Sequence, residues 1–496
     1  MRFSGLSCCV LCIGAAAALL AGCGGSQEPI TTPGAAYTVL DNSSGSYSPI
    51  KHVIIVIQEN RTFDNLFATF PKADGTTTGQ AEPMPQSVAT TCKSDGMPVI
   101  TQSNTTVTLT EVSLLGAGFP NNFGKGDDLA HVYAWPPNKL MPFLTDYDGG
   151  NMDGFDLEGQ GPNGSGLPLC TYPYQYVNPE DITEYWDLAR QYVLADHMFQ
   201  TQGSGSFTAH QDLIAGGTIL TGTYGSYSQP SVVDNPGGTV WGCTGSKYDW
   251  TSLISQNLVY LFKQGPAPPC FTYSTMRDLF DSASPPISWK YYTQKVVGSK
   301  GEWGAFQAIK AVAEGSEWGT KVVWPNTKIF TDLKGSSFPA VSWVTPIGDD
   351  SDHPQQAKDF GPSWVASIVN AVGKSNYWKS SAIVILWDDW GGFYDHEPPP
   401  FFDNQGGLGF RVPMIVVSPY VKAHVEHTQY EFGSVLKFIE KNWDLPSLGK
   451  TDERATSIGN LFNFNQKPRK FKVIPTHKPL SFFLTQKWNG LPPDPE

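Results

Sequence analysis

Four short apolar runs stand out along the chain, and each is nearly continuous rather than alternating with polar residues. They are HVIIVI (52–57), AVSWVT (340–345), AIVILW (382–387) and PMIVVS (413–418). Runs of this length, rich in β-branched residues, are typical of strands buried on both faces of a sheet. We therefore predict that the four segments are strands of one sheet.

Segments with helical periodicity lie among these runs, at 179–199, 361–372 and 431–443. Strands that alternate with helices favour an α/β fold, with a mostly parallel sheet and helices on both of its faces. The region 220–335 is rich in Gly, Ser, Pro and aromatic residues and has weaker periodicity. We interpret it as insertions that form a rim or lid on one domain, 50–450, and we expect 451–496 to be a C-terminal extension packed on that domain.

The first residues read as an export signal. Arg2 precedes the apolar run VLCIGAAAALLAGC, which is too short for a comfortable membrane span. Its end resembles the bacterial lipobox, which implies cleavage before Cys23 and acylation of that cysteine. We therefore predict a signal peptide at 1–22, a flexible tether at 23–49, and a protein that is exported and lipid-anchored to the bacterial envelope.

Composition and charge narrow the class of protein. The 496 residues are 40% hydrophobic and carry a net charge of -13, so the chain is globular and repels polyanions. We therefore expect no nucleic acid as a partner, and a phosphate substrate needs a local positive centre.

The cysteines indicate disulfides. An exported chain retains Cys92, Cys170, Cys243 and Cys270, an even number that predicts two bonds. Three pairings are open, and we expect the sequence neighbours to pair, Cys92 with Cys170 and Cys243 with Cys270.

Polar residues follow two of the predicted strands directly. Glu59 and Asn60 come after 52–57, and Asp388 and Asp389 come after 382–387. The carboxyl ends of parallel strands meet at one edge of a sheet, where ligands bind. Each residue alone fits a turn or a helix cap. Adjacent aspartates repel each other unless a cation lies between them, so we predict a metal site at this edge.

The chain also resembles the bacterial phosphoesterase family, which holds phosphatidylcholine-type phospholipases C and a periplasmic acid phosphatase. The resemblance rests on motifs that occur in the family's order: QENRTFDNLF (58–67), YDGGNMDGF (147–155), SDHP (351–354), WDDWGGFYDHEPPP (387–400) and GFRVPMIVVSPY (409–420). It implies a fold similar to that of the alkaline phosphatase superfamily.

The resemblance further implies a Ser or Thr nucleophile at the start of a helix. In QGSGSFTAHQDLIAGG (202–217), Ser206 falls on that position. Gly205 and Thr208 replace prolines that are usual in the family, so Ser204 and Thr208 stay as alternatives. A serine hydroxyl is a poor nucleophile until a metal ion or a base activates it.

The proposed metal centre consists of oxygen donors, which suit Mg, Mn or Ca, and Zn if histidines join. Its ligands are Glu59, Asn60, Asp388 and Asp389, with Ser206 as the reacting ligand.

Among the histidines, His131 and His353 are expected to be catalytic, with His353 as a phosphate ligand or as the acid that protonates the leaving oxygen. His396, Arg61 and Asn60 are expected to bind substrate, although Arg61 fits a structural salt bridge equally well. Structural or surface roles are favoured for His197, His210 and His427.

These features predict a metal-assisted phosphoric ester hydrolase with a phosphoserine intermediate. Phospholipase C-type hydrolysis of a phospholipid is the first interpretation, and hydrolysis of a small phosphomonoester by an acid phosphatase is the second. A non-catalytic surface lipoprotein is a third hypothesis. The sequence leaves the head group, the metal and the oligomeric state open.

Overall fold

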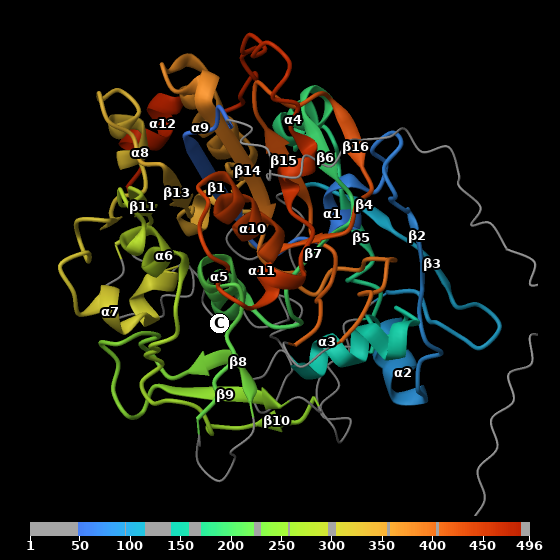
Figure 1. Cartoon of the computed structure of the whole chain (residues 1–496). Helices are drawn as coiled ribbons and strands as arrows, with labels where there is room; N and C mark the ends of the chain where they lie inside the picture. Colours follow the sequence, from blue (N-terminus) through green and yellow to red (C-terminus); the bar gives the residue numbers. More distant parts are fainter. Residues whose placement is uncertain are drawn as a thin grey trace, which may run out of the picture. The chain divides into compact units, whose positions relative to one another are not determined.

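An eight-stranded sheet forms the centre of the computed structural model (Figure 1). The structure describes residues 48–94, 96–114, 140–157, 170–222, 230–255, 258–295, 304–354, 358–402 and 406–487, all within one unit, Asn42–Glu496. The strands run in the order β12 (Val322–Val323), β11 (Trp289–Tyr292), β13 (Val341–Val344), β1 (His52–Gln58), β14 (Ser381–Trp387), β15 (Met414–Val417), β6 (Val193–Ala195) and β16 (His424–Glu426).

Every strand of this sheet except β15 points the same way. The predicted α/β fold with a mostly parallel sheet is therefore confirmed, and all four predicted strands are present. The segment 413–418 differs in direction, because β15 pairs antiparallel with both β14 and β6. The chain between β14 and β15 returns without a crossover helix, and such a connection joins antiparallel strands.

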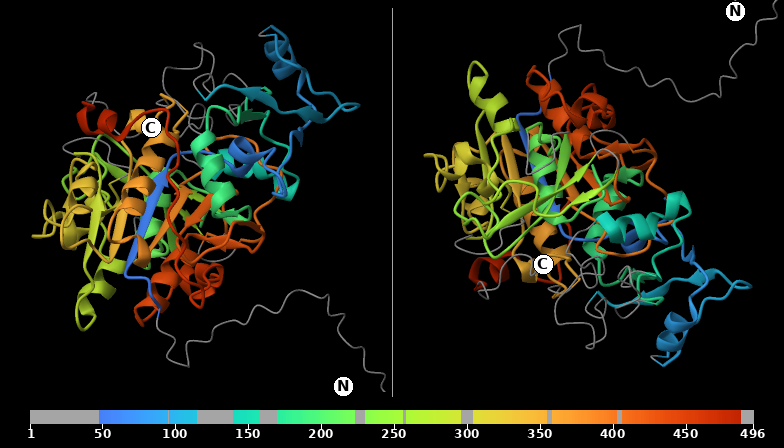
Figure 2. Two further views of the ribbon diagram at one scale, coloured as in Figure 1. Left: turned by 90° about the horizontal axis from the view of Figure 1, so that it is seen from above. Right: turned by 90° about the horizontal axis from the view of Figure 1, so that it is seen from below.

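Helices cover both faces of the sheet, as predicted (Figures 1 and 2). Trp387 of β14 packs on Tyr185 of α4, with ring centroids 4.9 Å apart. On the opposite face, Trp343 of β13 donates a hydrogen bond to the main-chain oxygen of Leu213 in α5, 3.1 Å away. The register through β1 places the two tryptophans on opposite faces. The main covering helices are α4 (Thr183–Gln191), α5 (Ser206–Ala215), α9 (Gly361–Lys374) and α10 (Phe432–Asn442).

The predicted helix at 179–199 is wrong in its second half. Helix α4 ends at Gln191, and the next residues form β6 and β7 (Met198–Phe199). Val193, Leu194 and Ala195 are fully buried between β15 and β16. Two flanking strands and complete burial therefore override the helical periodicity of the segment.

The region 220–335 is divided between two sheets. Strands β8 (Ser231–Gly237), β9 (Trp250–Ser255) and β10 (Tyr260–Leu261) form a separate three-stranded sheet. Strands β11 and β12, by contrast, belong to the main sheet.

The remaining elements surround this framework. They are α1 (Phe63–Phe67), β2 (Thr78–Gln80), α2 (Gln86–Ser94), β3 (Thr106–Thr108), β4 (Thr110–Val112), α3 (Leu140–Tyr147), β5 (Gln175–Val177), α6 (Met276–Ser282), α7 (Lys310–Ala313), α8 (Lys328–Asp332), β17 (Tyr430–Glu431), α11 (Thr451–Arg454) and α12 (Leu480–Thr485).

Two disulfides join Cys92 to Cys170 and Cys243 to Cys270, which confirms the expected pairing. In the part of the chain that the structure describes, no helix has the length and apolar character that a membrane crossing needs. The predicted signal peptide, most of the tether, Cys23 and His131 lie outside the described residues.

Candidate active site

The carboxyl ends of β1 and β14 bring the predicted ligands together. The two strands are parallel neighbours with Gln58 opposite Trp387, so the residues that follow them lie at one edge of the sheet. Asp388 Oδ1 accepts a hydrogen bond from the main-chain N–H of Asn60 at 3.0 Å. Asn60 has a φ of 54°, a left-handed conformation that asparagine tolerates better than most residues.

A glycine allows the loop after β14 to close on Asn60. Gly391 has a φ of 61°, and a Cβ placed there would lie 2.4 Å from the main-chain oxygen of Asn60. The Gly391 N–H donates to Asp389 Oδ1 at 2.8 Å and so fixes the carboxylate. A side chain at 391 would separate the two halves of the site.

Ser206 is the first residue of α5 and is fully buried. Its Oγ donates to Asp389 Oδ2 at 3.2 Å and lies 3.4 Å from Asn60 Oδ1. The free N–H groups and the positive dipole end of a helix N-terminus favour a phosphate at this point.

The two alternative nucleophiles face the separate sheet instead. Ser204 Oγ donates to Asp234 Oδ1 at 2.9 Å, and Thr208 Oγ1 donates to the main-chain oxygen of Val233 at 3.1 Å. Both acceptors belong to β8. The geometry therefore supports Ser206 over Ser204 and Thr208.

His210 joins the site, although the sequence favoured a packing or capping role for it. Its Nε2 lies 3.1 and 3.4 Å from the two carboxylate oxygens of Glu59 and 3.7 Å from Asp388 Oδ2. On the other side, the Tyr291 hydroxyl lies 3.5 Å from Nδ1. The signal for this contact was the spacing, because residues four apart lie on the same face of a helix that starts at Ser206.

The electrostatics of the site fit a bound cation. Burial and the neighbouring Glu59 raise the pKa of Asp388 well above its usual range, because two buried carboxylates repel each other. Burial lowers the pKa of His210 to about 4, so the ring is neutral and has one N–H donor and one lone pair. Among the described residues, Asp388 Oδ2 has no hydrogen-bond partner. Glu59, His210 and Asp388 offer ligand atoms within 4.8 Å of one another, and this mixed oxygen and nitrogen set suits a divalent metal ion.

Comparison with known proteins agrees with this chemistry. A family model described as the phosphoesterase family matches residues 50–446. The chain belongs to the phosphoesterase family. It is therefore a hydrolase that acts on phosphoester bonds, as the motifs implied.

Curated relatives of this phosphoesterase include phospholipase C B of Mycobacterium tuberculosis, which is 26% identical over 486 residues that cover 88% of this chain and 82% of that protein. A non-hemolytic phospholipase C of Pseudomonas aeruginosa is 23% identical, with 87% of this chain and 60% of that protein covered. A solved protein of the alkaline phosphatase superfamily from Vibrio parahaemolyticus overlaps with a TM-score of 0.31 at 10% identity, over 56% of this chain and 65% of that one.

Arg61 of the phosphoesterase braces the loop that leads to His353. It is fully buried, and its Nε donates to the main-chain oxygen of Asp352 at 2.8 Å while Nη1 donates to Asn65 Oδ1 at 3.1 Å. Burial raises the pKa of Asp352 to about 6, against the opposing effect of the Arg61 charge. These contacts support the bracing interpretation of Arg61, and its substrate role stays a prediction.

The other predicted histidines lie in different settings. His353 is fully buried, and its main-chain N–H donates to Ser351 Oγ at 3.3 Å. His396 belongs to a separate network, in which Nδ1 lies 2.7 Å from Asp64 Oδ2 and Nε2 lies 3.4 Å from Asp74 Oδ1. The catalytic role of His353 and the substrate role of His396 stay predictions.

Proposed function

We propose that the protein is a phosphodiesterase of the phospholipase C type, with Ser206 as the nucleophile. The observation that carries the proposal is the position of Ser206 Oγ, at the N-terminus of α5 and 3.2 Å from Asp389 Oδ2. The curated relatives named phospholipase C favour a phospholipid as the substrate.

In the first step, Ser206 Oγ forms a bond to phosphorus while the bond from phosphorus to the leaving alcohol oxygen breaks. Asp389 Oδ2 already accepts the hydrogen bond from Ser206, so it is within reach to take the proton. The leaving oxygen gains a proton from an acid, for which His353 and His131 are the candidates. In the second step, water attacks the phosphoserine and gives a proton to the group that acted as the acid, the bond from phosphorus to Oγ breaks, and Oγ regains its proton from Asp389.

Glu59, Asp388 and Asp389, together with Asn60, would hold a divalent metal ion, and His210 would orient Glu59 through the contact of its Nε2 with the Glu59 carboxylate. When bound, such an ion supplies positive charge that lowers the pKa of the serine hydroxyl and stabilises the transferring group. The residues of the chain orient the nucleophile and exclude water, since all of the named side chains are buried.

The test compares two neighbouring serines. We expect Ser206→Ala to lower kcat for p-nitrophenyl phosphorylcholine by roughly 10³-fold or more, because it removes the attacking atom. Ser204→Ala, which loses only the hydrogen bond to Asp234, is the matched control and should keep most of the activity. Full activity of a folded Ser206→Ala variant would refute the proposed nucleophile.

The choice of substrate class needs a second comparison. Wild-type protein is assayed with p-nitrophenyl phosphorylcholine and with p-nitrophenyl phosphate, before and after chelation and with several divalent metals added back. Turnover of the diester that chelation abolishes supports the phospholipase C type. Turnover of the monoester alone would instead indicate a phosphatase, and no turnover of either would contradict both proposed substrate classes.

A further inference from the structure

A second group of histidine and carboxylate side chains lies at the same edge of the main sheet, beyond β15. Strands β6 and β16 are parallel neighbours with Ala195 opposite Glu426. Asp196 and His427 follow these two residues, and the Asp196 N–H donates to the main-chain oxygen of Glu426 at 3.1 Å. The register of the edge strands therefore places a carboxylate and an imidazole side by side.

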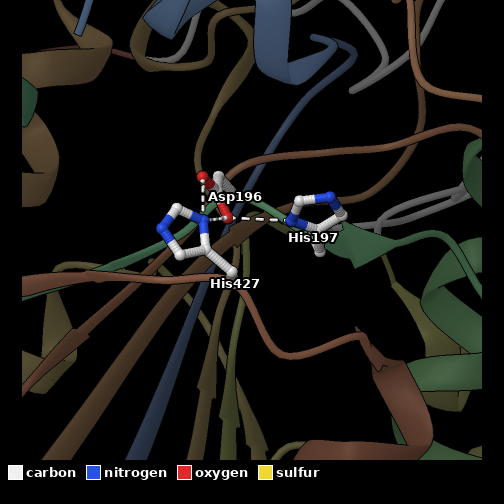
Figure 3. Close-up of side chains that lie close together, drawn as sticks. All are labelled: Asp196, His197 and His427. Atoms are coloured by element: carbon white, nitrogen blue, oxygen red, sulfur yellow. Dashed lines mark hydrogen bonds and ion pairs between the residues drawn. The ribbon is translucent and has the colours of Figure 1, made fainter. Parts of the chain in front are cut away.

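A third ligand comes from the residue after Asp196. His197 Nδ1 lies 2.9 Å from Asp196 Oδ1, and His427 Nδ1 lies 3.0 and 2.8 Å from Asp196 Oδ1 and Oδ2. Figure 3 shows the two rings turned toward the same carboxylate from opposite sides. Ligand atoms of all three side chains lie within 4.8 Å of one another.

The ligands of this group are held in place by neighbouring residues. Asp196 is fully buried, and its Oδ2 accepts a hydrogen bond from the Asp74 N–H at 2.8 Å. Arg411 Nη1 donates to the main-chain oxygen of Asp196 at 3.0 Å. The second ring nitrogen of His197, Nε2, lies 3.4 Å from Asp74 Oδ2. A histidine that binds a metal through one nitrogen usually donates the other N–H to a carboxylate, a main-chain carbonyl or water, and the Asp74 carboxylate is near enough to His197 Nε2 to serve in this way.

The geometry points to a metal site: we propose that Asp196, His197 and His427 bind one divalent transition-metal ion of the zinc class. Two imidazoles and one carboxylate suit Zn²⁺, Ni²⁺ or Cu²⁺ better than Mg²⁺ or Ca²⁺. Zinc bonds of about 2.0 Å in a tetrahedron separate ligand atoms by about 3.3 Å, so the 2.8–3.0 Å spacings around Asp196 need to widen only slightly.

Binding has a defined proton balance and a defined structural effect. Both Nδ1 atoms donate lone pairs, so any proton on them is released, while His197 Nε2 keeps the hydrogen that faces Asp74. Water completes the coordination, because the His427 side chain is 59% exposed. The ion would link the loop after β6 to the loop after β16.

A neighbouring group, formed by Asp74, His197 and Glu397, shares one histidine with this site. Its Asp74 to His197 contact is 3.4 Å, longer than the contacts around Asp196. We therefore assign the ion to Asp196, His197 and His427, and Asp74 becomes the residue that orients His197.

The test compares two exposed histidines, His424 at the start of β16 and His427 directly after its end. His427→Ala removes a ligand, whereas His424→Ala removes a ring that is 41% exposed and contacts Glu426 instead. Metal-free full-length wild type and both variants are titrated with Zn²⁺ by calorimetry and with Co²⁺ by visible absorption. We expect His427→Ala to bind one ion fewer than wild type or to bind it at least tenfold more weakly, and we expect His424→Ala to match wild type.

Asp74→Asn provides a second measurement that keeps all three ligands. Loss of a residue that orients a metal ligand lowers metal affinity by about 10- to 100-fold. The proposal is overturned if His427→Ala binds as many Zn²⁺ ions as wild type with unchanged affinity, or if His424→Ala loses as much as His427→Ala. These outcomes are read from metal binding and are independent of the Ser206 assay.

Discussion

Replacing His210 by phenylalanine removes the contact with Glu59 and keeps a ring of similar size in a fully buried position. His210 Nε2 lies 3.1 and 3.4 Å from the two Glu59 oxygens. A hydrogen bond to a charged group contributes about 1.5–3 kcal/mol, and about 1.4 kcal/mol corresponds to a factor of ten. We therefore expect affinity for the activating metal ion and kcat/KM to fall together by roughly 10- to 150-fold.

The assay follows hydrolysis of p-nitrophenyl phosphorylcholine over a range of divalent metal concentrations, with urea unfolding measured in parallel. Tyr291→Phe is the control. Its hydroxyl lies 3.5 Å from His210 Nδ1, so its removal leaves the Glu59 contact intact. A hydrogen bond of that length is weak, and we expect a change of less than about threefold. His210→Gln keeps an N–H donor and should recover part of the loss.

One outcome would show that His210 does not orient Glu59. In that case folded His210→Phe hydrolyses the substrate at the wild-type rate and with the wild-type metal dependence. A Tyr291→Phe variant as impaired as His210→Phe would also contradict it, because the effect would then not depend on the Glu59 contact.

Three further predictions concern stability. Burial lowers the pKa of His396, but Asp64 raises it by more, to about 9. Protonated His396 therefore contributes fully to the free energy of unfolding below pH 6.5, and this contribution is lost as pH rises through about 9. Because the ring is partly exposed, the contribution is about 1–2 kcal/mol, and the urea midpoint of His396→Gln should lose this pH dependence. Arg411→Met removes the guanidinium that lies 3.0 Å from buried Asp395 and 3.3 Å from buried Asp64, and should destabilise the fold by about 3–5 kcal/mol in urea unfolding. Adding Asp395→Asn to the same chain should restore part of this loss, and no loss in Arg411→Met would contradict the prediction. Trp364→Ala empties a fully buried position of α9 and should lower the free energy of unfolding by about 3–5 kcal/mol, and a loss below 1 kcal/mol would show that the core refills the space.

Much of the fold could be predicted because the central strands are apolar on both faces. The runs at 52–57 and 382–387 match β1 and β14 to within one residue at each end. The direction of β15 could not be predicted, because an apolar run reads the same for a parallel and an antiparallel strand. Strand β6 was missed for a related reason: three residues are too few to show a period of two beside the helical pattern of α4.

The candidate site shows a similar division. The polar residues that follow two predicted strands, together with the family motifs, predicted one site formed by Glu59, Asn60, Ser206, Asp388 and Asp389. In the structure, Ser206 contacts Asn60 and Asp389. Their catalytic roles stay predictions.

Contacts between segments that are distant in the chain could not be predicted from the sequence. His396 adjoins the Asp388–Asp389 motif in sequence, yet its ring contacts Asp64 and Asp74, which lie far back along the chain. A motif shows only that a residue is near the other motif residues in sequence. The conformation of the folded loops determines which side chains its ring contacts.

The direction of β15 also separates the two groups of ligands. Because β15 is antiparallel, its carboxyl end points away from the edge that carries Asp388. Its other neighbour in the sheet, β6, runs in the same direction as β14, so Asp196 lies at the same edge as Asp388. Two inter-strand spacings of about 4.8 Å put β6 about 10 Å from β14, too far for one ion to share ligands from both groups. His427→Ala should therefore leave the kcat of the Ser206 reaction within about twofold of wild type when metal is saturating. A large loss of kcat would mean that the two groups act as one site, which the strand order does not allow.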